Sequence, residues 1–484
     1  MPLLERVLVS KMLFSNTELM PFNFKRMANE NYLITSVTGD FEFISNENLR
    51  KLIAKDESLD IELYLKLKSK FFLISKNAIG TKRALASRLH SKKSTVLNGP
   101  ALHIIVVTIQ CMHSCSYCQV SRKQEGDEFT ISKEDLFLAC DTIFESTSET
   151  LTVEFQGGDP LLRYDLVKTA IEYISEKNKL HNRLIRFVVT TTLHQLTSEM
   201  CSFFKEHQVV LSTSIDGLAD LHNKNRPIAN RDAYERTLEG LELARKELGQ
   251  DSVSALMTTT RKSLDYPHEI VDAYVKLGFK EIFIRGLSDY GFAKKNSKRL
   301  APTQSEFLNF YSKALERVLY WNNEGYELIE VHAAILLNKI LSPFDQGYID
   351  LQSPSGAGLG CMVYNYDGYV YPSDEARMLK ETGDISLRLG KIGEPLSQLL
   401  SSNLQRNIIA SSLNFNDPSC RECAYLPYCG PDPISAYNEF SMMTPPTHLT
   451  SHCKRYMGLF DLIFNRYQDS ESFRKIANRW AFSK

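Results

Sequence analysis

The sequence lacks several features that would place it in a class at once. It has no charge excess, because 57 lysine and arginine residues balance 58 aspartate and glutamate residues and leave a net charge of −1. This balance argues against a protein that binds nucleic acid through bulk charge, so no nucleic-acid partner is expected. No apolar run approaches the roughly 18–20 residues that cross a bilayer, and the N-terminal residues lack the apolar stretch of a secretory signal. We therefore expect no membrane association and a cytoplasmic location.

Internal repeats and low-complexity segments are also lacking, and the composition is that of a soluble globular protein. Hydrophobic residues make up 43% and charged residues 24% of the 484 residues. This length is too great for one ordinary core and predicts two to four domains. The pattern predicts a small winged-helix-like module, a partial barrel, a helical bridge and an irregular region with a helical tail. The expected boundaries are residues 1–95, 96–300, 301–350 and 351–484.

Strand–helix alternation from residue 103 onward predicts an α/β fold. Six near-continuous apolar runs suit strands that are buried on both faces of a parallel sheet. Six such β/α units predict a partial, open (β/α)6 barrel, in which the chemistry lies at the C-terminal ends of the strands. The predicted strands are residues 103–109, 152–155, 186–192, 209–215, 253–259 and 281–287.

The segments on either side of this region have weaker patterns. Residues 31–45 predict two strands around a Thr-Gly-Asp turn, and two helical segments follow, which suits a small winged-helix module. The basic stretch at residues 81–93 is expected to be a solvated connector rather than a binding patch. Residues 303–341 and the tail from Lys454 are expected to be helical.

Three of the ten cysteines stand close together directly after the first predicted barrel strand. They are Cys111, Cys115 and Cys118. In a cytoplasmic protein such clustering favours metal ligands over disulfides. Three thiolates on one short loop can hold three irons of a [4Fe–4S] cluster and leave the fourth iron open, whereas zinc normally takes a fourth protein ligand. His113 is expected to be a loop residue rather than that ligand.

This spacing, with Tyr117 directly before the third cysteine, resembles the radical S-adenosylmethionine (SAM) superfamily. The resemblance implies that SAM chelates the open iron of the cluster. It implies further that a one-electron donor such as a flavodoxin or ferredoxin reduces the cluster. SAM is then cleaved to a 5′-deoxyadenosyl radical, which abstracts hydrogen from an unactivated carbon. Tyr117 would flank the cluster and the adenine.

The ends of the later strands carry residues that the same resemblance assigns to SAM binding. The Gly-Gly-Asp-Pro turn from Gly157 stands where the family has a Gly-Gly-Glu motif that binds the SAM ammonium group, and Asp159 replaces the glutamate. Arg226 is expected to reach the SAM carboxylate as a charge-assisted pair. Turn and cap chemistry is the plain alternative for each position. The expected SAM contacts are Tyr117, Gly157, Gly158, Asp159, Thr191, Ser214, Asp216, Arg226 and Arg285.

A second cysteine group lies in the C-terminal region. Cys420, Cys423, Cys429 and Cys453 could saturate a [4Fe–4S] cluster, and a tetrahedral zinc ion is the chemical rival. The region resembles the SPASM domain, a C-terminal extension of radical SAM enzymes that modify peptides. That domain usually carries two auxiliary clusters.

Two cysteines of the first auxiliary site are replaced, by Ser373 and by Pro433. We therefore expect one auxiliary [4Fe–4S] cluster, held by the four cysteines of the second group. Cys361 is then left over, as buried packing, as a free thiol that could donate hydrogen, or as a ligand of a degenerate site. Asp374 and Glu375 are candidates for a general base or for binding a basic peptide, although an exposed acidic turn explains them equally well.

Cys140 and Cys201 stand in apolar helical contexts and are expected to be core residues.

The runs from Cys111 to Arg122, from Phe283 to Ala293 and from Tyr371 to Leu379 resemble one group more closely. This group is the His-Xaa-Ser system radical SAM maturase, first of a pair of such enzymes. The resemblance implies a peptide or protein substrate with His-Xaa-Ser repeats, a cross-link or another oxidised product, and a second radical SAM maturase as a partner. The N-terminal module would recognise a leader peptide.

Three rival functions remain open. A formylglycine-forming sulfatase maturase would carry two full auxiliary sites, and Ser373 and Pro433 argue against that. A radical SAM enzyme acting on RNA fits poorly with the near-neutral charge. A non-enzymatic iron–sulfur or zinc scaffold that binds a peptide would normally have closed metal sites, unlike the three-thiolate loop.

Overall fold

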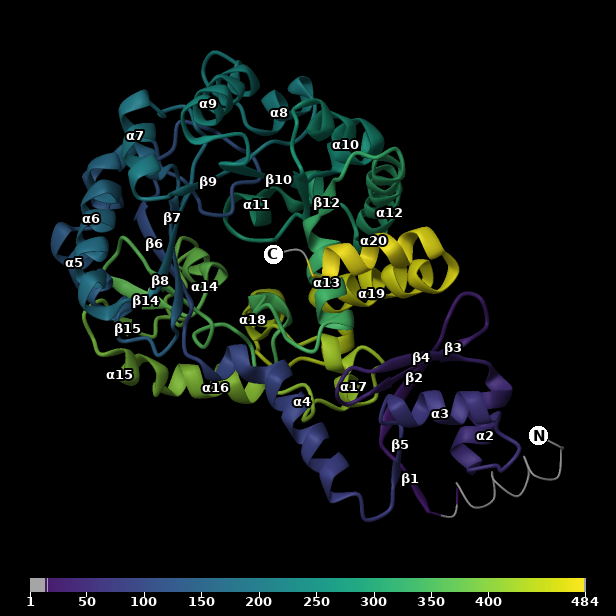
Figure 1. Ribbon diagram of the computed structural model, residues 1–484. Helices are drawn as coiled ribbons and strands as arrows, with labels where there is room; N and C mark the ends of the chain where they lie inside the picture. The colour runs from purple at the N-terminus through teal and green to yellow at the C-terminus, as the bar shows by residue number, and fades with distance from the viewer. Residues whose placement is uncertain (1–13, 15, 483–484) are drawn as a thin grey trace.

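A ten-stranded sheet organises the computed structural model, which describes residue 14 and residues 16–482 (Figure 1). Six of its strands pair side by side in chain order and run parallel. They confirm the six predicted strands and the open (β/α)6 arrangement. The strands are β6 (Leu102–Thr108), β7 (Thr150–Gly157), β8 (Leu184–Thr190), β9 (Val210–Ser214), β10 (Val253–Thr259) and β11 (Glu281–Gly286).

An arc of helices covers the outer face of these strands (Figure 1). Four of these helices begin with a side-chain cap or a proline, the usual signals for a helix start: α5 (Lys133–Ile143), α7 (Ser198–Glu206), α10 (Pro267–Lys276) and α12 (Gln304–Asn323). The parallel strands can pair only because such crossover segments return the chain to the same end of the sheet. The other helices of the arc are α6 (Tyr164–His181), α8 (Ala219–Asn225) and α9 (Ala233–Leu248). Helix α11 (Gly291–Leu300) lies inside the arc, where the amide of Phe292 donates to the carbonyl of Cys118.

Short strands extend both edges of the sheet. β12 (Ile329–Glu330) pairs with β11, and β13 (Cys361–Tyr364) pairs in parallel with β6. β14 (Tyr369–Tyr371) and β15 (Gly390–Lys391) then continue the sheet in antiparallel fashion. The region predicted as irregular therefore contributes three strands to the barrel sheet, and that part of the prediction was wrong.

The same region also contains several short helices. They are α14 (Asp374–Lys380), α15 (Leu396–Leu400), α16 (Asn403–Ser411), α17 (Pro418–Arg421) and α18 (Pro433–Phe440). The predicted helical bridge and tail are confirmed by α12, α13 (Val331–Leu341), α19 (Ser451–Asp469) and α20 (Glu471–Ala481). Within the described residues no helix has both the length and the apolar character to cross a membrane.

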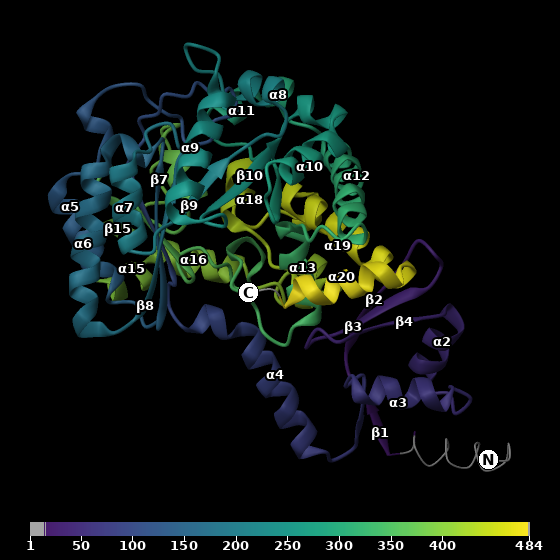
Figure 2. The same ribbon diagram turned by 45° about the horizontal axis from the view of Figure 1, so that its top comes forward.

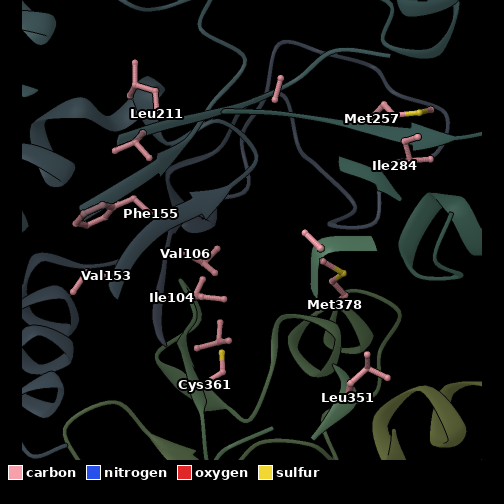
Figure 3. Packing of buried hydrophobic residues seen from close by; sticks show 14 of the residues in the cluster. Ile104, Val106, Val153, Phe155, Leu211, Met257, Ile284, Leu351, Cys361 and Met378 are labelled. Atoms are coloured by element: carbon pink, nitrogen blue, oxygen red, sulfur yellow. The ribbon is translucent and has the colours of Figure 1, made fainter. Parts of the chain in front are cut away.

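Alternate residues of the barrel strands fill one large core (Figure 3). Ile104 and Val106 of β6 lie near Phe155 of β7, and all three are buried. Burial of each such side chain contributes about 1.5–3 kcal/mol. Cys361 belongs to this core and is only 2% exposed, so β13 brings its thiol into the packing beneath β6.

The N-terminal residues form a separate small core around two little sheets. The predicted hairpin is present as β3 (Tyr32–Ser36) and β4 (Phe41–Ile44), and Gly39 adopts a positive φ of 86° in its turn. The winged-helix assignment stays a prediction. The remaining elements of this part are β1 (Thr17–Leu19), β2 (Phe22–Arg26), β5 (Leu73–Ser75), α2 (Asn46–Ala54) and α3 (Ile61–Ser69).

The basic stretch lies on α4 (Ile79–Leu97), a long helix that joins the small N-terminal part to the sheet (Figures 1 and 2). Its C-terminal half is not merely solvated. Lys92 donates a hydrogen bond to the carbonyl of Lys339, and Lys93 donates one to the carbonyl of Ser353. Burial lowers the pKa of each of these two lysines to about 8. This end of α4 is therefore an internal contact of the fold.

Candidate functional site

A cavity of about 220 Å³ opens at the C-terminal ends of the parallel strands. The thiol-bearing residues Cys111, Cys115 and Cys118 line it together, as the spacing predicted. Six of the nine residues expected to contact SAM also line it: Tyr117, Gly157, Gly158, Ser214, Arg226 and Arg285. Segments that are far apart in the sequence thus meet at one end of the sheet.

Hydrogen bonds hold the cysteine loop in place from several sides. The amide of Cys111 donates to the carbonyl of Lys123 at 3.0 Å, and the amide of Ser114 donates to the carbonyl of Pro227 at 2.7 Å. The carbonyl of Cys118 accepts from the amide of Phe292 at 2.9 Å. The loop is therefore fixed before any ligand binds, which suits a preorganised metal site.

The glycine turn after β7 packs directly on the start of this loop. A Cβ atom at Gly158 would lie 2.1 Å from the carbonyl oxygen of Gln110, and one at Gly157 would lie 2.0 Å from that of Thr108. Gly157 also adopts a φ of 136°. Both positions therefore need glycine, because a side chain would collide with the backbone of the cysteine loop.

Asp159 lies behind the cavity rather than in it. Its carboxylate accepts hydrogen bonds from Thr191 Oγ1 at 2.7 Å and from Thr192 Oγ1 at 2.5 Å, and the backbone amides of Leu161 and Thr192 donate to it as well. Asp159 is 2% exposed. Asp159 and Thr191 therefore tie the glycine turn to the end of β8, and Thr190 and Thr192, on either side of Thr191, line the cavity instead.

Asp216 and Arg226 form a buried ion pair beside Tyr117. Asp216 is 0% exposed and accepts hydrogen bonds from Tyr117 Oη at 2.7 Å, from Asn225 Nδ2 at 3.1 Å and from Arg226 at 3.3 Å. The Arg226 guanidinium lies 5.2 Å from the centre of the Tyr117 ring. Asp216 does not line the cavity, so it positions the two residues that do.

The charges of this pair support each other. Burial would raise the pKa of Asp216, but Arg226 and the hydrogen bond from Tyr117 outweigh it and hold that pKa below its usual range. Burial likewise opposes the charge of Arg226, and Asp216 keeps the pKa of Arg226 above its usual range. The guanidinium that lines the cavity is therefore always charged, which suits the binding of a carboxylate.

His113 lies inside the cysteine loop and lines the same cavity. Its Nε2 atom is 3.4 Å from each ring nitrogen of His194. Burial, with the neighbouring His194 and Arg226, lowers the pKa of His113 to about 2. Thr258, at the end of β10, also lines the cavity and was not predicted. Its only sequence signal is a hydroxyl at the C-terminal end of a strand.

The second cysteine group surrounds a larger cavity of about 610 Å³, which all four of its cysteines line. Asp417 caps the short helix α17 and accepts from the amide of Cys420 at 2.9 Å. Four thiols around one space fit an iron–sulfur cluster chemically. In residues 14 and 16–482, no three histidine, cysteine or acidic side chains converge tightly enough for a single metal ion.

The two positions that lack cysteine are both built into helix starts. Ser373 caps α14 and accepts from the amide of Ala376 at 3.2 Å, while Pro433 is the first residue of α18. Cys361 lines none of the cavities described here. The expected ligands of a first auxiliary site are therefore not gathered in this chain.

A third cavity, of about 360 Å³, lies between the other two. Arg285 and Gly286 line both this cavity and the first, and His452 lines both this cavity and the second. Of the two acidic candidates, Asp374 lines the first cavity and pairs with Arg377 at 2.7 Å, whereas Glu375 lines the third. Asp374 and Glu375, which are adjacent in the sequence, thus line different cavities.

Residues 105–284 match the family model described as the radical SAM superfamily. These residues form a radical SAM domain. The match runs from within β6 to within β11 and includes the cysteine loop, the glycine turn and the Asp216–Arg226 pair.

Two curated relatives are also similar to this chain. An uncharacterized protein of Methanothermobacter thermautotrophicus is 30% identical over 181 residues, which are 37% of this chain and 65% of that protein. The chain therefore spans slightly less than two thirds of the length of this relative. A cysteine-type anaerobic sulfatase-maturating enzyme of Clostridium novyi is 25% identical over 338 residues, which are 66% of this chain and 83% of that enzyme.

Solved structures share the fold over a longer part of the chain. Native anSMEcpe with bound AdoMet and Cp18Cys peptide aligns with a TM-score of 0.65 at 18% identity, over 78% of this chain and 100% of that one. Streptococcus suis SuiB bound to the precursor peptide SuiA aligns with a TM-score of 0.53 at 16% identity, over 89% of this chain and 98% of that one. At such identities these matches establish the fold alone.

Proposed function

We propose that this protein is a radical SAM enzyme that modifies a ribosomally made peptide or protein. The observation that carries the proposal is the common lining of the first cavity, where three thiols meet the glycine turn, Ser214 and Arg226. A peptide substrate is supported by the similarity to a sulfatase-maturating enzyme and by the two solved structures that contain peptides.

The residues present fit the two cofactors of this family. Cys111, Cys115 and Cys118 would hold three irons of a [4Fe–4S] cluster, and Arg226 would bind the carboxylate of SAM. A reduced cluster with SAM on its open iron is a source of a 5′-deoxyadenosyl radical, which can take hydrogen from an unactivated carbon. The chain binds and orients these groups: Asp216 keeps Arg226 charged and in place, and Gly158 lets the backbone approach closely.

The four thiols around the second cavity would hold one auxiliary [4Fe–4S] cluster, with zinc as the rival occupant. Counting metal distinguishes the two: about eight irons per chain for two four-iron clusters, or about four irons plus zinc. An electron donor such as a flavodoxin or ferredoxin would serve the first cluster. A second radical SAM maturase is the further partner that we propose.

The acidic candidates differ in their suitability as a proton acceptor for the substrate. Asp374 lines the cluster cavity and is held by Arg377, so it is the better placed. Burial and the nearby Asp350 raise the pKa of Glu375 to about 8, so an empty cavity keeps it protonated at neutral pH. Cys361 is buried in the core, and we assign it no catalytic role.

The substrate that we propose carries His-Xaa-Ser repeats and is cross-linked or otherwise oxidised. The test is to reconstitute the protein anaerobically, reduce it and incubate it with SAM and a His-Xaa-Ser repeat peptide. Mass spectrometry should then show loss of two hydrogens from the peptide for a cross-link. Cys115→Ala should abolish this change, and Cys201→Ala, which alters a buried cysteine remote from the lining residues, should retain it.

A formylglycine-forming sulfatase maturase is the second candidate, because the relative from Clostridium novyi carries that name. Ser373 and Pro433 argue against it, since they occupy helix starts where the first auxiliary site would need cysteines. The same assay with a cysteine-containing sulfatase peptide decides between the two. Formylglycine in that peptide, with no change in the His-Xaa-Ser peptide, would favour the second candidate.

A further inference from the structure

The third cavity has two electrically different ends. Near one end, Asp289 and Glu439 lie close to Lys294 and Arg455, so acidic and basic groups balance. Lys294 donates to Asn438, and Arg455 donates to the carbonyl of Leu287. This end is therefore near neutral.

Three carboxyl groups face one another at the other end. Asp350, Glu375 and Asp432 all line the cavity there, and the basic side chains beside them are Arg285 and His452. Burial and mutual repulsion raise the pKa of both Glu375 and Asp432. Three acidic side chains outnumber these two basic ones, so this end of the cavity is suited to a positive charge.

Aromatic side chains enclose this acidic end. The ring of His332 packs against Phe283, Tyr348 and Tyr456, with ring centres 5.8, 6.3 and 5.6 Å apart. All four rings line the cavity, and Tyr290 lines it too. Aromatic faces attract cations, and carboxylates beside them add a direct partner, as in pockets that bind ammonium groups.

Two buried polar groups in the lining also lack well-formed hydrogen bonds. Neither ring nitrogen of His332 makes one, with only the backbone of Ile284 beside it, nor does the hydroxyl of Tyr290, with Ser435 beside it. Each of these two residues is only 4% exposed. Buried polar atoms are normally satisfied, so such atoms on a cavity wall point to a ligand. Because no acidic or histidine side chains among the described residues converge on a single-metal site, an organic cation suits the space better than a metal ion.

We propose that this cavity receives the cationic side chain of a lysine or arginine of the substrate, beside the position that is modified. The inference rests on the proposed function, because Arg285 and Gly286 join this cavity to the one lined by the three cysteines. A cation held between Asp350 and Glu375 would place the neighbouring substrate residue at that junction. The enzyme would therefore select peptides with a basic residue next to the modified one.

Binding of matched probes tests this without relying on turnover. Calorimetric titration of the anaerobically reconstituted protein would compare N-acetyl-arginine methylamide with its neutral isostere, N-acetyl-citrulline methylamide, and the lysine amide with the norleucine amide. We expect each cationic probe to bind at least tenfold more tightly than its neutral partner. Asp350→Asn keeps the acceptor for Tyr348 Oη and should reduce this preference at least fivefold, as should Glu375→Gln.

Glu172→Gln removes the same charge from the exposed surface of α6 and should leave the preference unchanged. Equal binding of the charged and neutral probes would overturn the proposal. A preference that survives in both cavity variants, with their iron content and melting temperature intact, would also overturn it. SAM cleavage to 5′-deoxyadenosine, measured in the same preparation without probe, reports on the proposed function separately. Its absence together with a charge preference would refute the function and leave the cation site standing.

Discussion

Removing the guanidinium of Arg226 should destabilise the radical SAM domain strongly. Asp216 is fully buried, and Arg226 is its one cationic hydrogen-bond partner among the described residues. Arg226→Met keeps much of the side-chain volume but leaves a carboxylate without its countercharge. Breaking a buried pair in this way costs about 3–5 kcal/mol. For a domain of roughly 150–250 residues, this corresponds to a fall of about 6–20 °C in melting temperature.

The fall in melting temperature caused by Arg226→Met should also depend on pH. Arg226 holds the pKa of Asp216 below the ordinary value of 3.8, so the pair stabilises the fold above that pH and loses its effect as the pH falls. In Arg226→Met the hydrogen bonds from Tyr117 and Asn225 remain, but the guanidinium no longer opposes burial. The pKa of Asp216 therefore rises, and the variant is penalised more as the pH rises. The difference in melting temperature between wild type and variant should therefore be larger at pH 7.5 than at pH 4.5.

The assay is thermal unfolding followed by tryptophan fluorescence and circular dichroism. Arg261→Met is the matched control, because Arg261 pairs with Glu306 on the exposed surface, and it should melt close to wild type. An Arg226→Met protein that melts within a degree or two of the control at pH 7.5 would refute the argument. So would a difference that grows as the pH falls.

Three further changes test other parts of the fold and the site. Gly158→Ala should reduce cluster loading, because its Cβ would lie 2.1 Å from a carbonyl oxygen of the cysteine loop. Gly80→Ala is the control, because its Cβ meets open space, and it should be neutral or slightly stabilising. Iron content and melting temperature are measured for both variants. Glu330→Ala should lower the free energy of unfolding by about 2–5 kcal/mol, because it removes the cap of α13 and leaves the buried hydroxyl of Tyr311 without its acceptor. An unchanged melting temperature would contradict this prediction. Cys453→Ser should lower the iron content by up to about four per chain and leave SAM cleavage intact; an unchanged iron count would remove Cys453 from the ligand set.

Regular, local patterns made the barrel predictable from the sequence. Its six strands carry near-continuous apolar runs, which indicate burial on both faces of a sheet. The edge strands β12 to β15 were missed because they are two to four residues long. They are defined by pairing with distant segments, which leaves no local signal. The burial of Lys92 and Lys93 was missed for the same reason.

The candidate site was predicted in outline but not in detail. The cysteine spacing and the rule that chemistry lies at strand ends placed Cys111, Gly158 and Arg226 correctly around one cavity. Asp159 and Asp216 were expected beside SAM, yet each carboxylate accepts a hydrogen bond from another residue of the protein. Asp159 accepts from Thr191, and Asp216 accepts from Tyr117. A sequence shows where a strand ends but not in which direction the last side chains point.

The third cavity illustrates the limit of sequence reasoning. Asp350, Glu375 and Asp432 come from three separate segments, and His332 comes from a fourth. Each residue alone is unremarkable in the sequence, and only the tertiary fold brings them to one wall. The sequence singles out Asp374 and Glu375 as acidic candidates. Their side chains line different cavities because both residues lie in the first turn of α14.

The most direct test of the central claim is formation of 5′-deoxyadenosine by the reconstituted, reduced protein in the presence of SAM. The radical SAM assignment predicts that mass spectrometry detects it for the wild type and for Cys201→Ala, and that Cys115→Ala makes none. A fully loaded and reduced wild-type protein that yields no deoxyadenosine would contradict the account. Equal yields from wild type and Cys115→Ala would contradict it as well.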